Sequence, residues 1–109
     1  MKLRRDIFQA ISDPTRRAIL SLLAMGGLTP GVITDHFSSS RQTISKHLQI
    51  LTECRLVKQQ VAGREVYYSL NPQKMKEVSD WVEQFRELWE GRLNRMERVL
   101  KDINKKNKT

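Results

Sequence analysis

Residues 38–51 read SSSRQTISKHLQIL and concentrate hydrogen-bond donors at the start of a helical pattern. Ile44, Leu48 and Leu51 are spaced four and three residues apart, so they share the face of a helix that packs on a core. The opposite face carries donors and no acid before Glu53 at its far end. A solvated helix usually mixes charges of both signs. By itself, the stretch fits either a well-capped surface helix or a surface for an anionic ligand.

The outward side chains suit nucleic acid in two ways. Long donors such as Arg41, Gln42 and Lys46 can reach base edges in a major groove, which is about 12 Å wide and admits one helix. Small hydroxyl groups let the helix end approach phosphates, which its dipole also favours. We expect His47, at the edge of this face, to reach a phosphate as well. The predicted DNA contacts on this helix are Ser39, Ser40, Arg41, Gln42, Thr43, Ser45, Lys46 and His47.

Capping signals place this stretch in a larger arrangement of helices. A residue that can cap free amides directly precedes a proline at three helix starts, which are Asp13-Pro14, Thr29-Pro30 and Asn71-Pro72. Ser39 with Gln42 predicts a capping box, and with it a helix from 39 to about 53. Residues 3–11 form a short amphipathic pattern in front. The centre of the chain therefore reads as helix, tight polar turn, helix.

A two-stranded hairpin is predicted directly after this unit. Residues 56–70 read LVKQQVAGREVYYSL, with β-branched and aromatic residues on both sides of Ala62-Gly63-Arg64. A hairpin behind a helix-turn-helix is the wing of a winged helix. Arg64 at its tip can reach a neighbouring phosphate or a minor groove, and Lys58 is a weaker candidate.

A long helix is predicted from 73 to about 104, followed by a disordered basic tail, residues 105–109. Apolar residues follow a spacing of four and three along it, interrupted where Arg92 falls on the stripe. A core of about 70 residues cannot cover so many apolar positions, so part of the helix should pack on a second copy of the chain. A helix folded back on its own domain is the alternative. The predicted dimer-interface residues, including part of the first helix, are Leu3, Ile7, Phe8, Val78, Trp81, Val82, Phe85, Leu88, Trp89 and Met96.

The remaining residues with reactive side chains favour structural roles. Cys54 is interpreted as a small buried residue at a helix end rather than a redox switch, and His36 as a surface residue beside a turn. Trp81 and Trp89 could line a pocket for an apolar effector, but dimer contacts are the preferred interpretation. No nucleophile–base–acid set and no glycine-rich phosphate loop is visible, so we expect no enzyme activity.

The composition agrees with a polyanionic partner. The chain has 109 residues, a formal net charge of +8 and a sequence pI near 10.1, which is typical of nucleic-acid-binding domains. No window approaches the run of about 18 apolar residues that a membrane span requires, and the N-terminus lacks a signal-peptide core. We expect a cytoplasmic protein with no membrane partner.

Three segments resemble the winged helix-turn-helix of the ArsR/SmtB-type transcriptional repressors, and particularly its metal-independent, autorepressor-like branch. They read DPTRRAILSLLA, SSSRQTISKHLQILTECRLV and GREVYYSLN, and the resemblance covers about residues 3–72. It implies a homodimer whose first and last helices form the interface and whose helix 39–53 enters the major groove of DNA. It also implies that Arg41, Gln42, Thr43, Ser45 and Lys46 face the DNA, which agrees with the helix face described above.

The chain departs from the family's metal sensors. Thr29, Gly31 and Thr34 stand where thiolates would lie, and residues 73–109 contain no histidine. Zinc needs converging sulfur, nitrogen and oxygen donors, and softer metals need thiolates. We therefore expect no metal and no cofactor, while the sequence leaves open whether a small-molecule effector exists.

These observations predict a mainly α fold with a small β-hairpin wing. A winged helix-turn-helix DNA-binding domain spans residues 1–72, and a C-terminal dimerisation helix spans residues 73–104. The expected function is sequence-specific repression of transcription by a homodimer on an inverted-repeat operator. The family resemblance implies that the protein's own operon is one target. The alternative is a winged-helix adaptor that binds RNA or protein without reading a DNA sequence.

Overall fold

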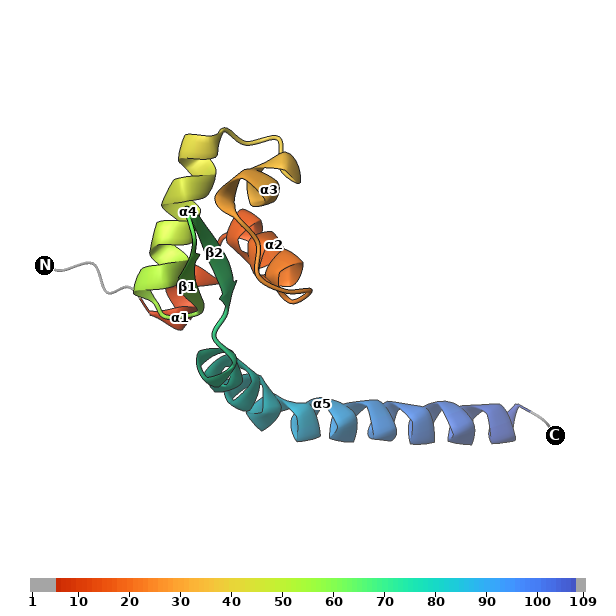
Figure 1. The fold of residues 1–109 in the computed structure, drawn as a ribbon. Helices are drawn as coiled ribbons and strands as arrows, with labels where there is room; N and C mark the ends of the chain where they lie inside the picture. The colour runs from red at the N-terminus through yellow and green to blue at the C-terminus, as the bar shows by residue number, and fades with distance from the viewer. Residues whose placement is uncertain (1–5, 108–109) are drawn as a thin grey trace, which may run out of the picture. The chain divides into compact units, whose positions relative to one another are not determined.

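The computed structural model of the chain describes residues 6–107 and is mainly helical with one two-stranded sheet (Figure 1). The elements in chain order are α1 (Ile7–Ala10), α2 (Pro14–Leu23), α3 (Pro30–Asp35), α4 (Arg41–Glu53), β1 (Val57–Ala62), β2 (Glu65–Leu70) and α5 (Pro72–Lys106). This order confirms the predicted winged helix-turn-helix fold class. Within the described residues, no helix combines the length and the apolar character needed to cross a membrane.

The helix starts follow the predicted capping chemistry. The side chain of Asp13 accepts a hydrogen bond from the backbone amide of Arg16, and that of Thr29 accepts one from Val32. In both helices proline occupies the first turn, where the missing amide costs no intrahelical bond. These caps fix where α2 and α3 begin.

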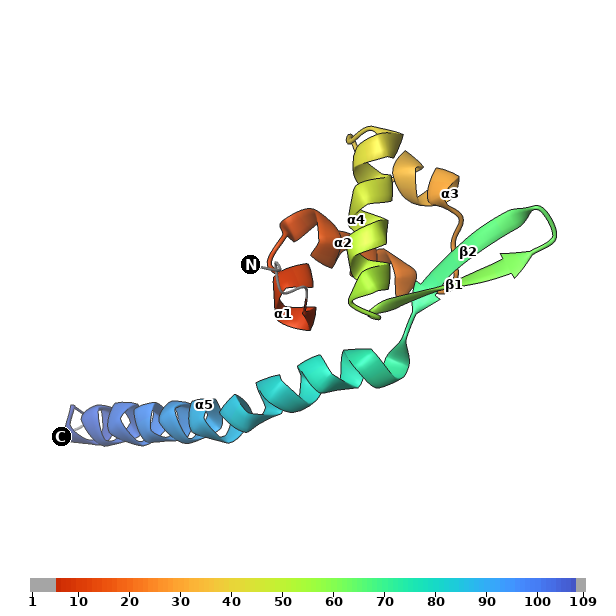
Figure 2. The same cartoon turned by 90° about the vertical axis from the view of Figure 1, so that its left-hand side faces the viewer.

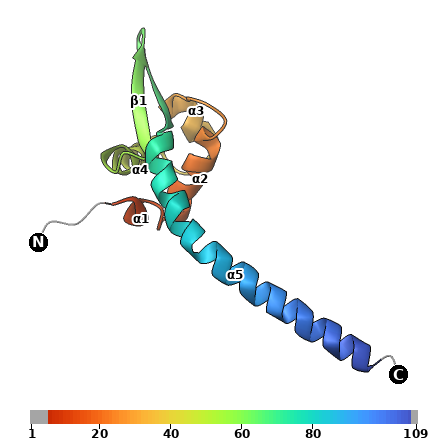
Figure 3. The ribbon, with the colours of Figure 1, turned by 90° about the horizontal axis from the view of Figure 1, so that it is seen from below.

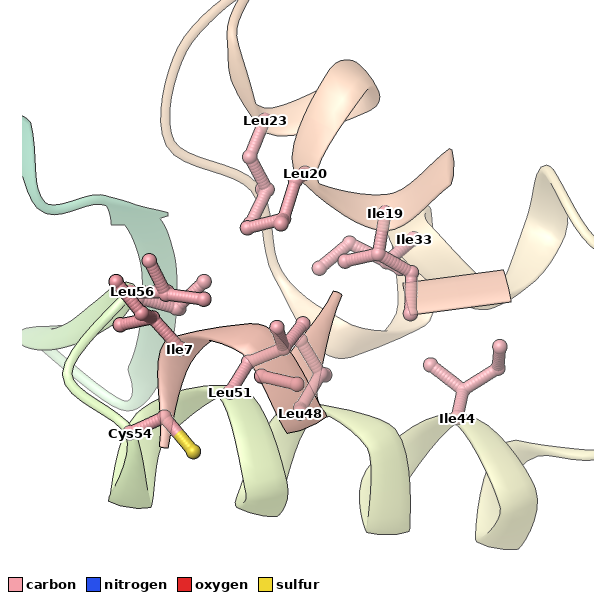
Figure 4. Packing of buried hydrophobic residues seen from close by; sticks show 12 residues of the cluster. Ile7, Ile19, Leu20, Leu23, Ile33, Ile44, Leu48, Leu51, Cys54 and Leu56 are labelled. Carbon is pink, nitrogen blue, oxygen red and sulfur yellow. The ribbon is translucent and has the colours of Figure 1, made fainter. Parts of the chain in front are cut away.

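One apolar core holds α2, α3 and α4 together. Ile44, Leu48 and Leu51 point from α4 towards α2 and α3 (Figure 4), and none of the three is more than 1% exposed. Ile19 of α2 and Ile33 of α3 are fully buried opposite them. Because this face of α4 is held in the core, the opposite face is fixed towards solvent.

The hairpin is an antiparallel pair in which Val57 lies opposite Leu70 and Ala62 opposite Glu65. Its two-residue loop needs a positive φ, which Gly63 supplies at 65°. Figures 2 and 3 show the hairpin extending away from the helices of the first unit. Leu28 and Tyr68 exchange backbone hydrogen bonds of 2.9 and 2.8 Å, which attach β2 to the segment before α3. The wing is therefore anchored at its base to the helix-turn-helix.

The chain divides into two compact units between Val78 and Ser79. The first turns of α5 belong to the first unit, because Met75 and Val78 pack against its core. The second unit is the remainder of α5, in which no described residue is buried. The helix ends at Lys106, so the prediction that residues 105 and 106 lie in a disordered tail is wrong. Basic residues in a last helical turn interact favourably with the helix dipole, which supports this extension.

Candidate nucleic-acid interface

The exposed face of α4 carries four donors close together in its first two turns. Arg41, Gln42, Ser45 and Lys46 are all exposed, and their side chains have no hydrogen bond or ion pair with any other described residue. The two later polar side chains on this face, Gln49 and Glu53, bond to each other at 3.2 Å. Donor groups that are not already paired within the chain can be offered to a ligand, and they lie at the start of the helix.

The cap of α4 differs from the prediction by one residue. The N-cap is Ser40, whose Oγ accepts a hydrogen bond from the backbone amide of Thr43 at 3.2 Å, so the predicted Ser39–Gln42 capping box is wrong. Ser40 and Thr43 also join their hydroxyl groups at 3.0 Å. Ser39 is half-buried in the turn before the helix. Three consecutive serines can each cap a helix, and the tertiary position of the turn selects among them.

A groove of about 430 Å³ brings the helix and the wing together. Arg41, at the start of α4, and Arg64, in the hairpin loop, both line it, with Thr29, Pro30, Gly31, Glu65 and Val66. The structure thus places on one surface two cations that are 23 positions apart in the sequence. The sequence reasoning did not identify Glu65. The hydroxyl group of Tyr67 donates to its carboxylate at 3.2 Å, and this bond and the carboxylate charge raise the pKa of Tyr67.

His47 lies away from the exposed donors and faces the start of α2. Its Nδ1 is 3.4 Å from Nη1 of Arg16 and 3.9 Å from Oδ2 of Asp13, and its side chain is 16% exposed. Burial opposes the charged form of Asp13, but the backbone hydrogen bonds from Arg16 and Thr15 and the positive charge of the Arg16 guanidinium outweigh burial and lower the pKa of the carboxyl group. The sequence reasoning missed Arg16. Its spacing of three residues before the buried Ile19 was the available signal, because it places Arg16 near the core face of α2.

The predicted dimer residues fall into two groups. Ile7 is only 7% exposed and packs in the core of its own chain, and Val78 is half-buried against the same core. Leu3 lies outside the described residues. The other predicted residues are exposed, and they are Phe8, Trp81, Val82, Phe85, Leu88, Trp89 and Met96. The same face of α5 continues with exposed Leu93, Val99, Leu100 and Ile103.

Two further predictions concerned residues outside the interface. Cys54 is 5% exposed at the end of α4, as predicted for a small buried residue, and His36 is exposed at the end of α3. In the part of the chain that the structure describes, no three histidine, cysteine or acidic side chains are grouped as a metal ion would need.

Comparisons with known proteins agree with this geometry. A helix-turn-helix domain family matches residues 11–60. The chain is 42% identical over 80 residues to the transcriptional repressor SdpR of Bacillus subtilis, an alignment that covers 73% of this chain and 89% of that protein.

Solved structures show the same relationship. An ArsR-like transcriptional regulator from Rhodococcus sp. RHA1 is 30% identical, with a TM-score of 0.66 over 85% of this chain and 88% of that one. A homodimeric winged helix-turn-helix DNA-binding domain from Mycobacterium bovis is 25% identical, with a TM-score of 0.62 over 73% and 74%. The fold, the exposed donor face and these relatives together show that the chain belongs to the ArsR/SmtB-type family of winged helix-turn-helix transcriptional regulators.

Proposed function

We propose that the chain is a repressor of transcription that binds double-stranded DNA sequence-specifically, as a homodimer on an inverted-repeat operator. The observation that carries this proposal is the acid-free start of α4, whose exposed Arg41 lines one groove together with Arg64 of the wing. Relatives that are named transcriptional repressors support the regulatory role. As a repressor, the protein would act on chromosomal DNA in the cytoplasm, without an enzymatic activity or a cofactor.

In this proposal different side chains of the winged domain contact the bases and the phosphates. Arg41, Gln42, Ser45 and Lys46 contact base edges in the major groove, where long donors distinguish base pairs. The hydroxyl-bearing residues at the start of α4, which are Ser39, Ser40 and Thr43, lie nearer the phosphates. Arg64 extends the contact from the wing to a neighbouring phosphate or minor groove. The winged domain therefore binds DNA, and most of α5 is left for dimerisation.

The second unit supports the dimer. Val82, Phe85, Trp89, Met96 and Val99 are between 41% and 64% exposed and follow the heptad spacing of a coiled-coil seam. Exposed apolar surface of this extent marks an interaction site on a protein that is otherwise polar. A second copy carries the same stripe, so the pairing can close with two-fold symmetry. On an inverted-repeat operator, the α4 helices of the two copies would enter successive major grooves about 34–36 Å apart, one turn of DNA.

The charges along this helix favour an antiparallel arrangement of the two copies. Residues 79–91 carry four acidic side chains and one basic, a formal charge of −3, whereas residues 92–107 carry six basic and two acidic, a formal charge of +4. Parallel helices would place like charges together and Arg92 of one seam beside Arg92 of the other. Antiparallel helices place the acidic half against the basic half, and Arg92 can then lie on the Trp89 ring of the second copy.

The DNA-binding proposal can be tested by replacing the side chains that should contact base edges and measuring whether the protein still prefers its operator sequence. Operator fragments would first be selected from the genome by their retention on the protein. Replacing Gln42 and Lys46 together with Ala should then remove most of the preference for a retained fragment over a scrambled duplex, since each good base contact is worth about 1–3 kcal/mol of discrimination. Fluorescence anisotropy with labelled duplexes measures this ratio.

A matched control is available in the same chain. Gln73 and Lys76 are the same residue types on the exposed side of the first turns of α5, and their double replacement with Ala should leave discrimination unchanged. Unchanged discrimination in the Gln42 and Lys46 variant would instead support an adaptor that does not read DNA. Binding should also weaken steeply with salt, because phosphate contacts release counterions.

A further inference from the structure

Arg16 connects three segments of the first unit through one guanidinium group. Its Nε donates to the backbone oxygen of Ala10 at 2.7 Å, and its Nη2 donates to that of Gln9 at 3.2 Å, so it holds the last carbonyl groups of α1. Its Nη1 lies 3.4 Å from Nδ1 of His47 in the second turn of α4. A single side chain of α2 therefore reaches both α1 and the helix that we propose enters the DNA.

The chemistry of this contact fixes which group donates. A guanidinium group has donors only, so in a hydrogen bond between the two side chains Nδ1 of His47 is the acceptor. The neighbouring Asp13 is held in place by its own role as the cap of α2, where it accepts from the Arg16 amide at 3.0 Å. Asp13, Arg16 and His47 thus form a fixed polar cluster between α2 and α4.

His47 connects this cluster to α4, the helix that we propose reads the DNA sequence. Lys46 precedes it, and the buried Leu48 follows it. The buried side chains of Ile44 and Leu48 hold α4 on the core, and the contact between Arg16 and His47 adds a directional restraint on the orientation of the helix. Rotation of α4 by a small angle would move Gln42 and Lys46 relative to the base edges, since a displacement of about 1 Å is enough to lose a well-formed contact.

We propose that Arg16 and His47 are positioning residues for sequence reading, with His47 oriented by Arg16 rather than placed on a phosphate. This inference rests on the proposed function, because it concerns how the same helix reads the operator. It assigns to His47 a role different from the phosphate contact predicted from the sequence. The cluster sets the orientation of the base-reading donors relative to α1 and α2, and it contributes to discrimination between sequences rather than to general affinity for DNA.

The decisive variants are His47→Ala and His47→Asn in the full-length protein. His47→Ala should reduce the preference for the operator over a scrambled duplex about tenfold, which corresponds to about 1.4 kcal/mol. It should leave the affinity for the scrambled duplex and the salt dependence of binding unchanged. His47→Asn should restore most of the discrimination, since the amide oxygen can accept from Arg16 near the position of Nδ1. Loss of a phosphate contact would instead reduce the salt slope by about one, and this result would overturn the proposal.

A double-mutant cycle tests whether the two residues act through each other. Arg16→Ala combined with His47→Ala should cost no more discrimination than the larger single effect, whereas additive costs would overturn the link. Arg17→Ala is the matched control. Arg17 donates to the backbone oxygen of Ile11 at 2.7 Å and so holds the residue that follows α1 in a similar way. Among the described residues, no hydrogen bond or ion pair joins its side chain to α4, so the variant should retain discrimination.

The outcomes separate this inference from the proposed function. A wild-type protein that does not prefer any genomic fragment over a scrambled duplex would contradict the proposed function itself. A wild-type protein that discriminates, together with a His47→Ala variant that discriminates equally well, would overturn only the positioning role. Because Arg16 also holds α1, thermal unfolding of every variant is measured in parallel, and the His47 pair alone decides if Arg16→Ala fails to fold.

Discussion

At the scale of single residues, the candidate interface contains two groups of polar side chains. One group is hydrogen-bonded within the chain, and the other is exposed and can bind a ligand. Asp13, Arg16 and His47 are engaged with one another beneath the recognition helix, whereas Arg41, Gln42 and Lys46 are exposed without a side-chain partner among the described residues. Pairing makes the first group rigid, and the absence of pairing leaves the second group available. Arginine, the one residue type that the two groups share, therefore has a different task in each.

Asp13 gives a prediction about stability in acid. Its folded-state pKa is below the ordinary value of 3.8, so its charge stabilises the fold above that pH, and the contribution is lost as the pH falls through the lowered value. Asp13→Asn keeps a good capping oxygen and removes the charge. The wild type should exceed this variant in urea resistance at pH 6, and the difference should shrink by pH 3. An equal difference at both pH values would show that the charge of Asp13 does not contribute.

At the scale of elements, α4 depends on a cap that the sequence alone does not identify. The tract Ser38-Ser39-Ser40 offers three equivalent hydroxyl groups, and only the packing of α3 on α4 decides which one stands before the first helical residue. The spacing of Ile44, Leu48 and Leu51, by contrast, defines the buried face without any tertiary information. Periodic patterns predict the face of an element better than its first residue.

Replacing each serine in turn distinguishes the two possible caps. Ser40→Ala removes the acceptor for the Thr43 amide and should lower the free energy of unfolding by about 1 kcal/mol, the usual value for such a cap. Ser39→Ala should cost less than about 0.5 kcal/mol, as for most substitutions away from such features. Equilibrium urea unfolding measures both. A larger cost at Ser39 would restore the capping box predicted from the sequence.

The sequence predicted the order of elements, the hairpin turn at Gly63 and the donor face of α4, because each depends on local spacing or on one backbone requirement. It did not predict the Arg16–His47 contact, since those residues are 31 positions apart and their meeting depends on how α2 packs on α4. The amphipathic pattern of the first helix likewise did not show that Ile7 packs in the core of its own chain. Local chemistry is readable from sequence, and long-range pairing is not.

At the scale of the whole molecule, the second unit should determine the oligomeric state. Deleting residues 85–109 removes most of the exposed apolar stripe, including Trp89 and Met96. The shortened protein should be a monomer, and light scattering measures its mass in solution. Operator affinity should fall as well, because the two half-sites are no longer bound by linked domains.

A shorter deletion is the control. Removing residues 105–109 leaves the stripe through Ile103 intact, so that variant should remain dimeric and bind as the full chain does. A chain lacking residues 85–109 that still sediments as a dimer would show that the interface lies in the first unit.

The lack of buried residues in the second unit has a consequence for how the repressor responds to its own abundance. A helix that buries nothing within its chain gains its packing only from a second copy, so its order and the pairing of the domains rise together with protein concentration. If the dimer is the form that occupies the operator, occupancy at low abundance rises with the square of the protomer concentration. Repression would then rise more steeply with protein concentration than it would for a repressor that binds as a monomer.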